Sequence, residues 1–147
     1  MKTTMKVFLV LFFVIILFLL VNSAIEIKTA CINGKCFDIE TADSNEKINK
    51  GLSKREFLPE DSGMLFIFEK EIIPKFWMKD MNFPLDIIWI NKEMEILGIE
   101  ENLQPCRESF CQTYSPKKEI KYVLEINAGI SETAEFKEGH KIIFRRF

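Results

Sequence analysis

The feature that most constrains the fold is the apolar run LDIIWI at residues 85–90, which directly follows Pro84. In an extended chain alternate side chains point to opposite faces, and here both faces are apolar after the first pair. We therefore predict a β-strand that is covered on both sides. Pro84 stands where a missing N–H removes no hydrogen bond from the sheet.

Asp86 is the one charged residue of this strand. A carboxylate that enters an apolar sheet must be paired, hydrogen-bonded or close to the end of the sheet. Lys79 is the nearest basic candidate along the chain, and Lys121 or Arg55 could reach Asp86 in the fold. These three residues are the candidates if Asp86 is paired with a base.

Several short motifs are arranged around this strand in a recognisable order. FWMKD at 76–80 and PLDII at 84–88 are accompanied by GLSKR at 51–55, GMLFIF at 63–68, Pro105-Cys106 and YVLEINAG at 122–129. From residue 39 to residue 147 the chain resembles the domain of unknown function 192 family, with Ser53, Asp80 and His140 replacing the family's usual residues. The resemblance implies a mostly β, single-domain β-sandwich or jelly-roll-like barrel with one or two short helices. It implies no activity, because none is established for the family.

The N-terminus carries an uninterrupted hydrophobic run at residues 7–21, preceded by Lys2 and Lys6 and followed by Asn22-Ser23-Ala24. This order is typical of a secretory signal peptide. As a helix the run would span about 22 Å, short of the roughly 30 Å of a bilayer core, and extending it to Ile25 gives about 28 Å. The sequence therefore predicts a cleaved signal peptide or a retained membrane anchor helix in residues 1–24, with residues 25–147 exported as one β-rich domain.

Asn33-Gly34 predicts a tight hairpin, because a type I′ turn needs positive φ at both central residues. A two-residue loop makes Ile32 and Lys35 the first pair across the turn and sets Cys31 opposite Cys36 as the next. The Cα atoms of such a pair lie about 4.5–5.5 Å apart, within the range of a disulfide. Since an exported chain is normally oxidised, we expect a Cys31–Cys36 bond.

The other two cysteines, Cys106 and Cys111, have the same C-x4-C spacing and lie in an irregular segment, residues 102–116. We expect a second local disulfide, which would stiffen this segment. Two alternatives stay open: a zinc site formed by all four thiolates, and free or redox-active thiols. The preferred interpretation includes no metal and no cofactor.

The remaining pattern predicts short strands separated by turns, and two short helical segments. We expect further strands at 63–68, 94–100, 122–127 and 141–144, with the 94–100 strand pairing to the 85–90 strand. We expect helical segments at 131–136 and at 43–51, where Asp43 is the N-cap and Gly51 the stop.

Charged and aromatic residues within the motifs are the candidates for a functional site. If Asp86 and Glu125 met in one cleft, they could act as an acid–base pair or bind a cation, and they are the only catalytic candidates. The favoured alternative is a structural ion pair with Lys79 or Arg55, or simple solvation at the end of the sheet. Phe76, Trp77 and Phe83 could line a pocket, although such residues are more often core. The ligand-binding candidates are Arg55, Trp77, Lys79, Asp86, Tyr114 and Glu125.

The composition of the chain and the motifs that it lacks exclude several classes of function. A net charge of −2 leaves no basic face for nucleic acid. One histidine, His140, rules out a multi-histidine metal site within one chain, and there is no G-x-S-x-G, Walker or dinucleotide-binding motif. We expect a non-enzymatic, secreted or membrane-anchored cell-surface domain that binds a small molecule or a surface protein through residues 102–116 beside 76–83. The alternatives are a hydrolase or lyase that uses Asp86 and Glu125, and a structural envelope protein.

Overall fold

A computed structural model describes residues 12–14 and 27–146 of the 147-residue chain. The hydrophobic run at residues 7–21 falls almost wholly outside the described residues, so the signal peptide or anchor helix stays a prediction. Within the described part of the chain, no helix has the length and apolar character needed to cross a membrane.

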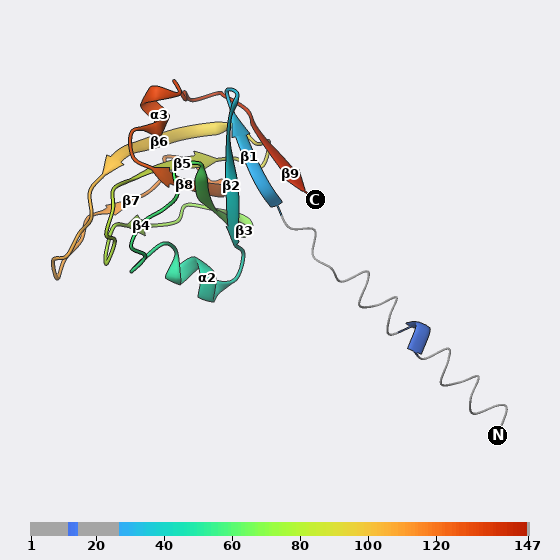
Figure 1. The fold of residues 1–147 in the computed structure, drawn as a ribbon, viewed down its shortest axis with the longest axis horizontal. Helices are drawn as coiled ribbons and strands as arrows, with labels where there is room; N and C mark the ends of the chain where they lie inside the picture. Colours follow the sequence, from blue (N-terminus) through green and yellow to red (C-terminus); the bar gives the residue numbers. More distant parts are fainter. Residues whose placement is uncertain (1–11, 15–26, 147) are drawn as a thin grey trace.

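Strands dominate the fold between residues 27 and 146 (Figure 1). In chain order the elements are β1 (Ile27–Ile32), β2 (Lys35–Ala42), α2 (Asn45–Lys50), β3 (Ser62–Ile72), β4 (Phe76–Trp77), β5 (Leu85–Ile90), β6 (Ile96–Leu103), β7 (Thr113–Tyr114), β8 (Ile120–Asn127), α3 (Ile130–Thr133) and β9 (Ile142–Arg146). Seven strands form one sheet in the order β6-β5-β8-β3-β2-β1-β9, and β4 pairs with β7 separately. The predicted mostly β fold with short helices is confirmed.

The large sheet is curved, but its edge strands do not join. In Figure 1, β1 and β2 run across the direction of β5 and β6. The end strands β6 and β9 approach each other beside a single bridge between Glu95 and Lys141. Two backbone hydrogen bonds flank it, from Ile96 N to His140 O at 3.0 Å and from Ile142 N to Met94 O at 2.8 Å. Because no ladder connects β6 to β9 in the described chain, the barrel part of the prediction is wrong.

The hairpin between β1 and β2 forms as the sequence predicts. Asn33 and Gly34 have φ of 47° and 86°, the left-handed values that the tight turn requires. The register sets Cys31 opposite Cys36. The other edge of β1 pairs with β9, where Ile27 lies opposite Arg146, so the described ends of the domain are neighbours.

Both predicted disulfides are present, Cys31–Cys36 with Cα atoms 4.0 Å apart and Cys106–Cys111 with Cα atoms 5.9 Å apart. None of the four cysteines is free, so no thiolate is left for zinc or for redox chemistry. Since disulfides persist in oxidising compartments, the two bonds indicate a location outside the cytoplasm.

The predicted central strand, β5, is buried along its whole length between β6 and β8. Its alternate residues enter two different cores. Ile87 and Trp89 belong to a cluster that we call the Trp89 cluster. Ile88 and Ile90 belong to a second cluster, the Phe37 cluster, which joins β5 and β8 to β1, β2 and β9. Each fully buried large side chain contributes about 1.5–3 kcal/mol, so both cores stabilise the fold substantially.

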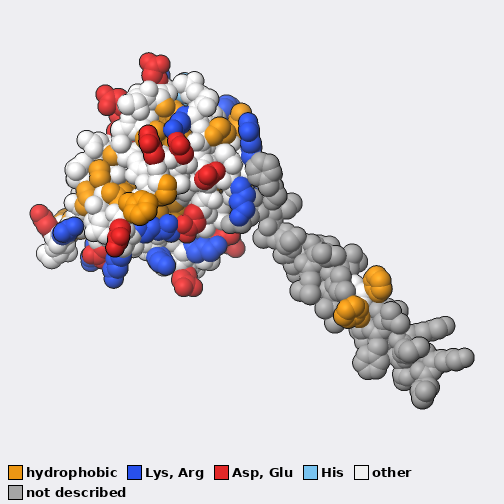
Figure 2. All heavy atoms as spheres, in the orientation of Figure 1, with side chains coloured by type: hydrophobic (Ala, Val, Ile, Leu, Met, Phe, Trp, Pro, Cys, Tyr) orange, Lys and Arg blue, Asp and Glu red, His pale blue; other side chains and the backbone are white. Residues whose placement is uncertain are grey.

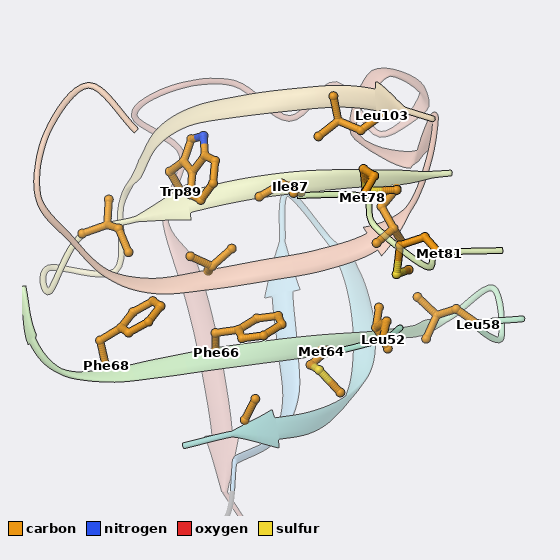
Figure 3. Packing of buried hydrophobic residues seen from close by; sticks show 14 residues of the cluster. Leu52, Leu58, Met64, Phe66, Phe68, Met78, Met81, Ile87, Trp89 and Leu103 are labelled. Carbon is orange, nitrogen blue, oxygen red and sulfur yellow. The ribbon is translucent and has the colours of Figure 1, made fainter. Parts of the chain in front are cut away.

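Irregular segments and the short strand β4 cover the Trp89 cluster. Figure 3 shows Phe66 and Phe68 projecting from β3 on the same side of the sheet as Trp89. Leu52 and Leu58 reach this core from the segment after α2, and Met78 and Met81 from the segment after β4. Loops and the two-stranded sheet of β4 and β7 therefore complete the core on this face of the large sheet.

The helix α2 is shorter than predicted, and its N-cap differs. Ser44, not Asp43, is the N-cap, because the Ser44 hydroxyl accepts a hydrogen bond from Lys47 N at 3.4 Å. Asp43 instead accepts from Lys47 Nζ at 2.9 Å. Gly51 ends the helix with a φ of 50°, as predicted.

Candidate functional site

Strand β8 places Glu125 in the middle of the sheet, between β3 and β5. Its Cα partners are Met64 and Ile87, and cross-strand partners share a face, so Glu125 points into the Trp89 cluster. Glu125 is only 5% exposed. No residue of the described chain donates a hydrogen bond to its carboxyl group or forms an ion pair with it.

Burial raises the pKa of Glu125 from 4.5 to about 8, because an ionised carboxylate loses its hydration in these apolar surroundings. At neutral pH the group is therefore mostly a neutral carboxylic acid. In that form it can donate one hydrogen bond and accept others.

Glu125 lines a pocket of about 250 Å³ beside the Trp89 cluster. The walls come from three parts of the chain: the end of α2 with the turn after it, strand β3, and the segment on either side of β4. Four aromatic side chains take part, namely Phe66, Phe68, Phe76 and Trp77. The rings of Phe66 and Phe76 pack edge to face at 4.9 Å, so this aromatic wall is held in place by its own contacts.

The rim of the pocket is charged. Lys50, Lys75 and Lys79 line it together with one acid, Asp80, and all four residues are exposed. The ammonium group of Lys79 lies 5.7 Å from the ring centroid of Trp77, within the range of a cation–π contact. Figure 2 shows basic side chains beside hydrophobic ones over the part of the molecule that holds α2 and β4.

The segment at residues 102–116 fixes one wall of the pocket from outside. Strand β7 pairs with β4, which sets Tyr114 opposite Phe76, and a bridge joins Lys79 to Cys106. The Cys106–Cys111 disulfide closes this segment on itself. The structure therefore places residues 102–116 beside 76–83.

Asp86 lies on the other face of the sheet. Its Cα partner on β8 is Ile126, a member of the Phe37 cluster. Asp86 is fully buried and accepts three backbone hydrogen bonds, from Asn102 N at 2.8 Å, Gly129 N at 3.1 Å and Ser131 N at 2.9 Å. It is a structural acid that ties β6 and the start of α3 to β5. Asp86 and Glu125 do not share a cleft, so the acid–base pair considered from the sequence is not assembled.

The three basic residues considered as partners for Asp86 lie elsewhere, and of the possibilities named from the sequence it is hydrogen bonding that applies. Arg55 pairs with Glu40 at 2.8 Å, and Lys121 donates to Glu69 O at 2.8 Å. Lys79 lies at the rim of the pocket on the opposite face. Backbone N–H groups satisfy Asp86 because the end of β6 and the start of α3 meet at its position.

Of the six ligand-binding candidates, the structure brings three together: Trp77, Lys79 and Glu125. Tyr114 packs against the Trp89 cluster and lines a separate concavity in the disulfide-closed segment. Of the three aromatic residues considered for a pocket, Phe76 and Trp77 line it and Phe83 does not.

Sequence reasoning did not identify four residues that line the pocket, namely Lys50, Lys75, Phe66 and Phe68. The alternation of Phe66 and Phe68 along a predicted strand was a usable signal, because both side chains had to share one face.

Two solved structures share this fold. A protein of unknown function from Novosphingobium aromaticivorans DSM 12444 has 28% sequence identity and a TM-score of 0.74, over 83% of this chain and 88% of that chain. A "putative transcription regulator" from Sinorhizobium meliloti 1021 has 26% identity and a TM-score of 0.74, over 84% of this chain and 97% of that chain. No curated protein matches this chain.

The family model DUF192, described as "Uncharacterized ACR", matches residues 28–144. That span holds β2 to β8 entire and most of β1 and β9, together with every residue that lines the pocket. The resemblance drawn from the FWMKD and PLDII motifs is confirmed, and this chain belongs to the DUF192 family.

Proposed function

We propose that this protein is a non-enzymatic domain that binds a small molecule in the pocket beside Glu125. The observation that carries the proposal is the Glu125 carboxyl group, which is 5% exposed and has no hydrogen-bonding partner among the described residues. Its oxygen atoms are not among the fully buried side-chain atoms that lack a hydrogen-bond partner, so they reach the surface of the pocket. A ligand in the pocket can supply the hydrogen-bond partner that the described residues do not.

The shape and lining of the pocket support a small ligand. Pockets for drug-sized molecules measure roughly 300–1,000 Å³ and combine apolar walls with a few polar groups. The volume of about 250 Å³ lies just below that range. Aromatic rings form the wall and one carboxyl group lies among them, which is the combination of contact area and orientation that such sites use.

A binding role fits the pocket better than catalysis. The acid–base pair considered from the sequence needs two titratable groups, each within hydrogen-bond reach of the reacting atoms. Among the described residues that line the pocket, the other acid is Asp80, which is exposed at the rim, and Asp86 faces the opposite side of the sheet. Among the described residues that line the pocket, Glu125 is therefore the only acid in its inner part.

The proposed place of action is the cell exterior or the cell surface. The two disulfides support an oxidising location. The hydrophobic run at residues 7–21 would direct export. In the mature protein this run would be either cleaved off or retained as a membrane anchor. Intact mass of the exported protein separates these two forms, because cleavage removes the leader.

The test of binding is a screen of small fragments against the exported protein by protein-observed NMR, with the indole N–H signal of Trp77 as the reporter in the pocket. Ser53 lines the pocket, so the variant Ser53→Phe inserts a ring into it. The control variant Ser109→Phe adds the same ring to an exposed loop position outside the pocket.

We expect fragments that perturb Trp77 to bind the wild type and the Ser109→Phe variant and to be lost from Ser53→Phe. Thermal midpoints of both variants check that the fold is kept. A blank screen against the wild type, or hits that bind Ser53→Phe equally well, would contradict the proposed function.

A further inference from the structure

The inner part of the pocket offers one hydrogen-bond donor in neutral surroundings. The residues next to Glu125 on the same face are Met64 and Ile87 on the adjacent strands and Val123 and Asn127 on β8. All four are uncharged, and the Asn127 amide donates to Leu58 O at 2.9 Å and Pro59 O at 3.1 Å. At neutral pH the Glu125 carboxyl group is protonated, so it presents an O–H for which the described residues provide no acceptor.

The rim of the pocket carries an excess of positive charge. The charged residues that line the pocket besides Glu125 are Lys50, Lys75, Lys79 and Asp80, which are three cations and one anion. Burial is the cause of the raised pKa of Glu125, whereas the four rim residues are exposed, so solvent screens their charges. A rim of one predominant sign raises the local concentration of ligands of the opposite sign.

A cationic ligand fits this distribution poorly. An ammonium ion would pass three like charges at the rim and would then meet a carboxyl group that must lose its proton to form an ion pair. An anion is attracted at the rim, and its oxygen meets a donor that is already in place. Between the two ends, the rings of Phe66, Phe76 and Trp77 provide contact area for a flat apolar body.

Building on the proposed binding function, we propose that the ligand is a small organic anion. Its apolar body packs on the aromatic wall, the rim lysines attract its charge, and one of its oxygens accepts a hydrogen bond from the Glu125 carboxyl group. This assigns a ligand class to the pocket and a donor role to Glu125.

The test compares three probes of similar shape and different charge: benzoate, benzamide and benzylamine. Each is titrated into the exported protein by NMR or calorimetry at pH 6.5. We expect benzoate to bind at least tenfold more tightly than benzylamine, with benzamide between them. Above pH 8 the affinity for benzoate should fall about tenfold per pH unit, because Glu125 then loses the proton that it donates.

Two substitutions test separately the hydrogen bond from Glu125 and the attraction by the rim lysines. Glu125→Gln keeps an N–H donor that does not titrate, so benzoate should still bind and its affinity should stay constant from pH 6 to pH 9. Lys75→Gln should weaken benzoate binding several-fold at low salt. Lys118→Gln removes an exposed lysine outside the pocket and should leave benzoate binding unchanged.

The outcomes distinguish this inference from the proposed function. Tighter binding of benzylamine than benzoate, or fragment hits that contain no anions, would overturn the ligand class and leave the pocket as a binding site. A benzoate affinity that does not change between pH 6 and pH 9 in the wild type would overturn the donor role of Glu125. A blank fragment screen would overturn the binding function itself.

Discussion

Two buried carboxyl groups lie on adjacent strands of the same sheet and have opposite surroundings. Asp86 on β5 is fully buried, and three backbone N–H groups donate to it. Glu125 on β8 is 5% exposed and receives no hydrogen bond from any described residue. Both residues are buried, so low exposure alone does not distinguish them. Hydrogen bonding does: the satisfied acid supports the fold, and the unsatisfied acid is available to a ligand.

The position of each acid along its strand explains the difference. Asp86 is near the start of β5, where the end of β6 and the turn into α3 leave N–H groups outside the ladders. Asn102 and Gly129 have φ of 52° and 81°: Asn102 lies at an irregularity of the β5–β6 ladder, and Gly129 lies in the turn before α3. Glu125 is in the middle of β8, where strands on both sides use the neighbouring N–H groups in their own ladders.

The largest expected effect is the pH dependence of stability caused by Glu125. Its pKa is raised from 4.5 to about 8 in the folded chain, so the folded state holds an extra proton between these values and stability falls as pH rises through this window. Relative to Glu125→Gln, the wild type should lose about 4 kcal/mol of unfolding free energy between pH 5 and pH 9. Urea denaturation of both proteins across this range measures it, and parallel profiles would show that Glu125 is already satisfied.

The next effect concerns Asp86. Asp86→Ala should destabilise the protein by about 3 kcal/mol or more, because it removes charge-assisted hydrogen bonds and leaves three backbone N–H groups without an acceptor. Asp38→Ala, at an exposed position on β2, is the matched control and should change stability by less than about 0.5 kcal/mol. Denaturant midpoints give both values. If Asp86→Ala cost no more stability than Asp38→Ala, the hydrogen bonds of Asp86 would not support the fold, and Asp86 would no longer differ from Glu125 in that respect.

The smallest expected effect tests whether the two faces of the large sheet, which different segments cover, are independent of each other. Replacing Cys106 and Cys111 by serine should cost about 2 kcal/mol and speed hydrogen exchange in β4 and β7, which cover the Trp89 cluster. Exchange in α3, on the Asp86 side, should stay slow. The control replaces Cys31 and Cys36 by serine, which loosens the β1–β2 hairpin on the Phe37 side instead. Faster exchange in α3 in the first variant would show that the two faces are not independent.

Local signals predicted much of the fold. Asn33-Gly34 predicted the hairpin and with it the Cys31–Cys36 register, because a two-residue turn leaves one choice of pairing. Pro84 and the apolar run after it predicted β5 with its bounds. Alternation along residues 122–127 placed Glu125 on the face opposite Tyr122, Leu124 and Ile126, as observed.

Long-range contacts could not be predicted in the same way. The donors to Asp86 are 16, 43 and 45 residues away, and no local pattern marks a backbone N–H as free. Glu125 is unpaired because loops from residues 51–58 and 74–81 cover its face without offering it a donor, which depends on how the whole chain closes. β3 extends to Ile72 beyond the predicted end at Phe68, because Ile72 pairs with Ile120 across an irregular part of the ladder.

The pairing of Ile27 with Arg146 puts the two described ends of the domain in one corner. A short linker could join them without crossing the molecule, so a circularly permuted chain, reopened at the exposed turn Lys92-Glu93, should keep the same sheet. Any fusion partner added to the C-terminus would emerge beside the point where the preceding segment enters the domain.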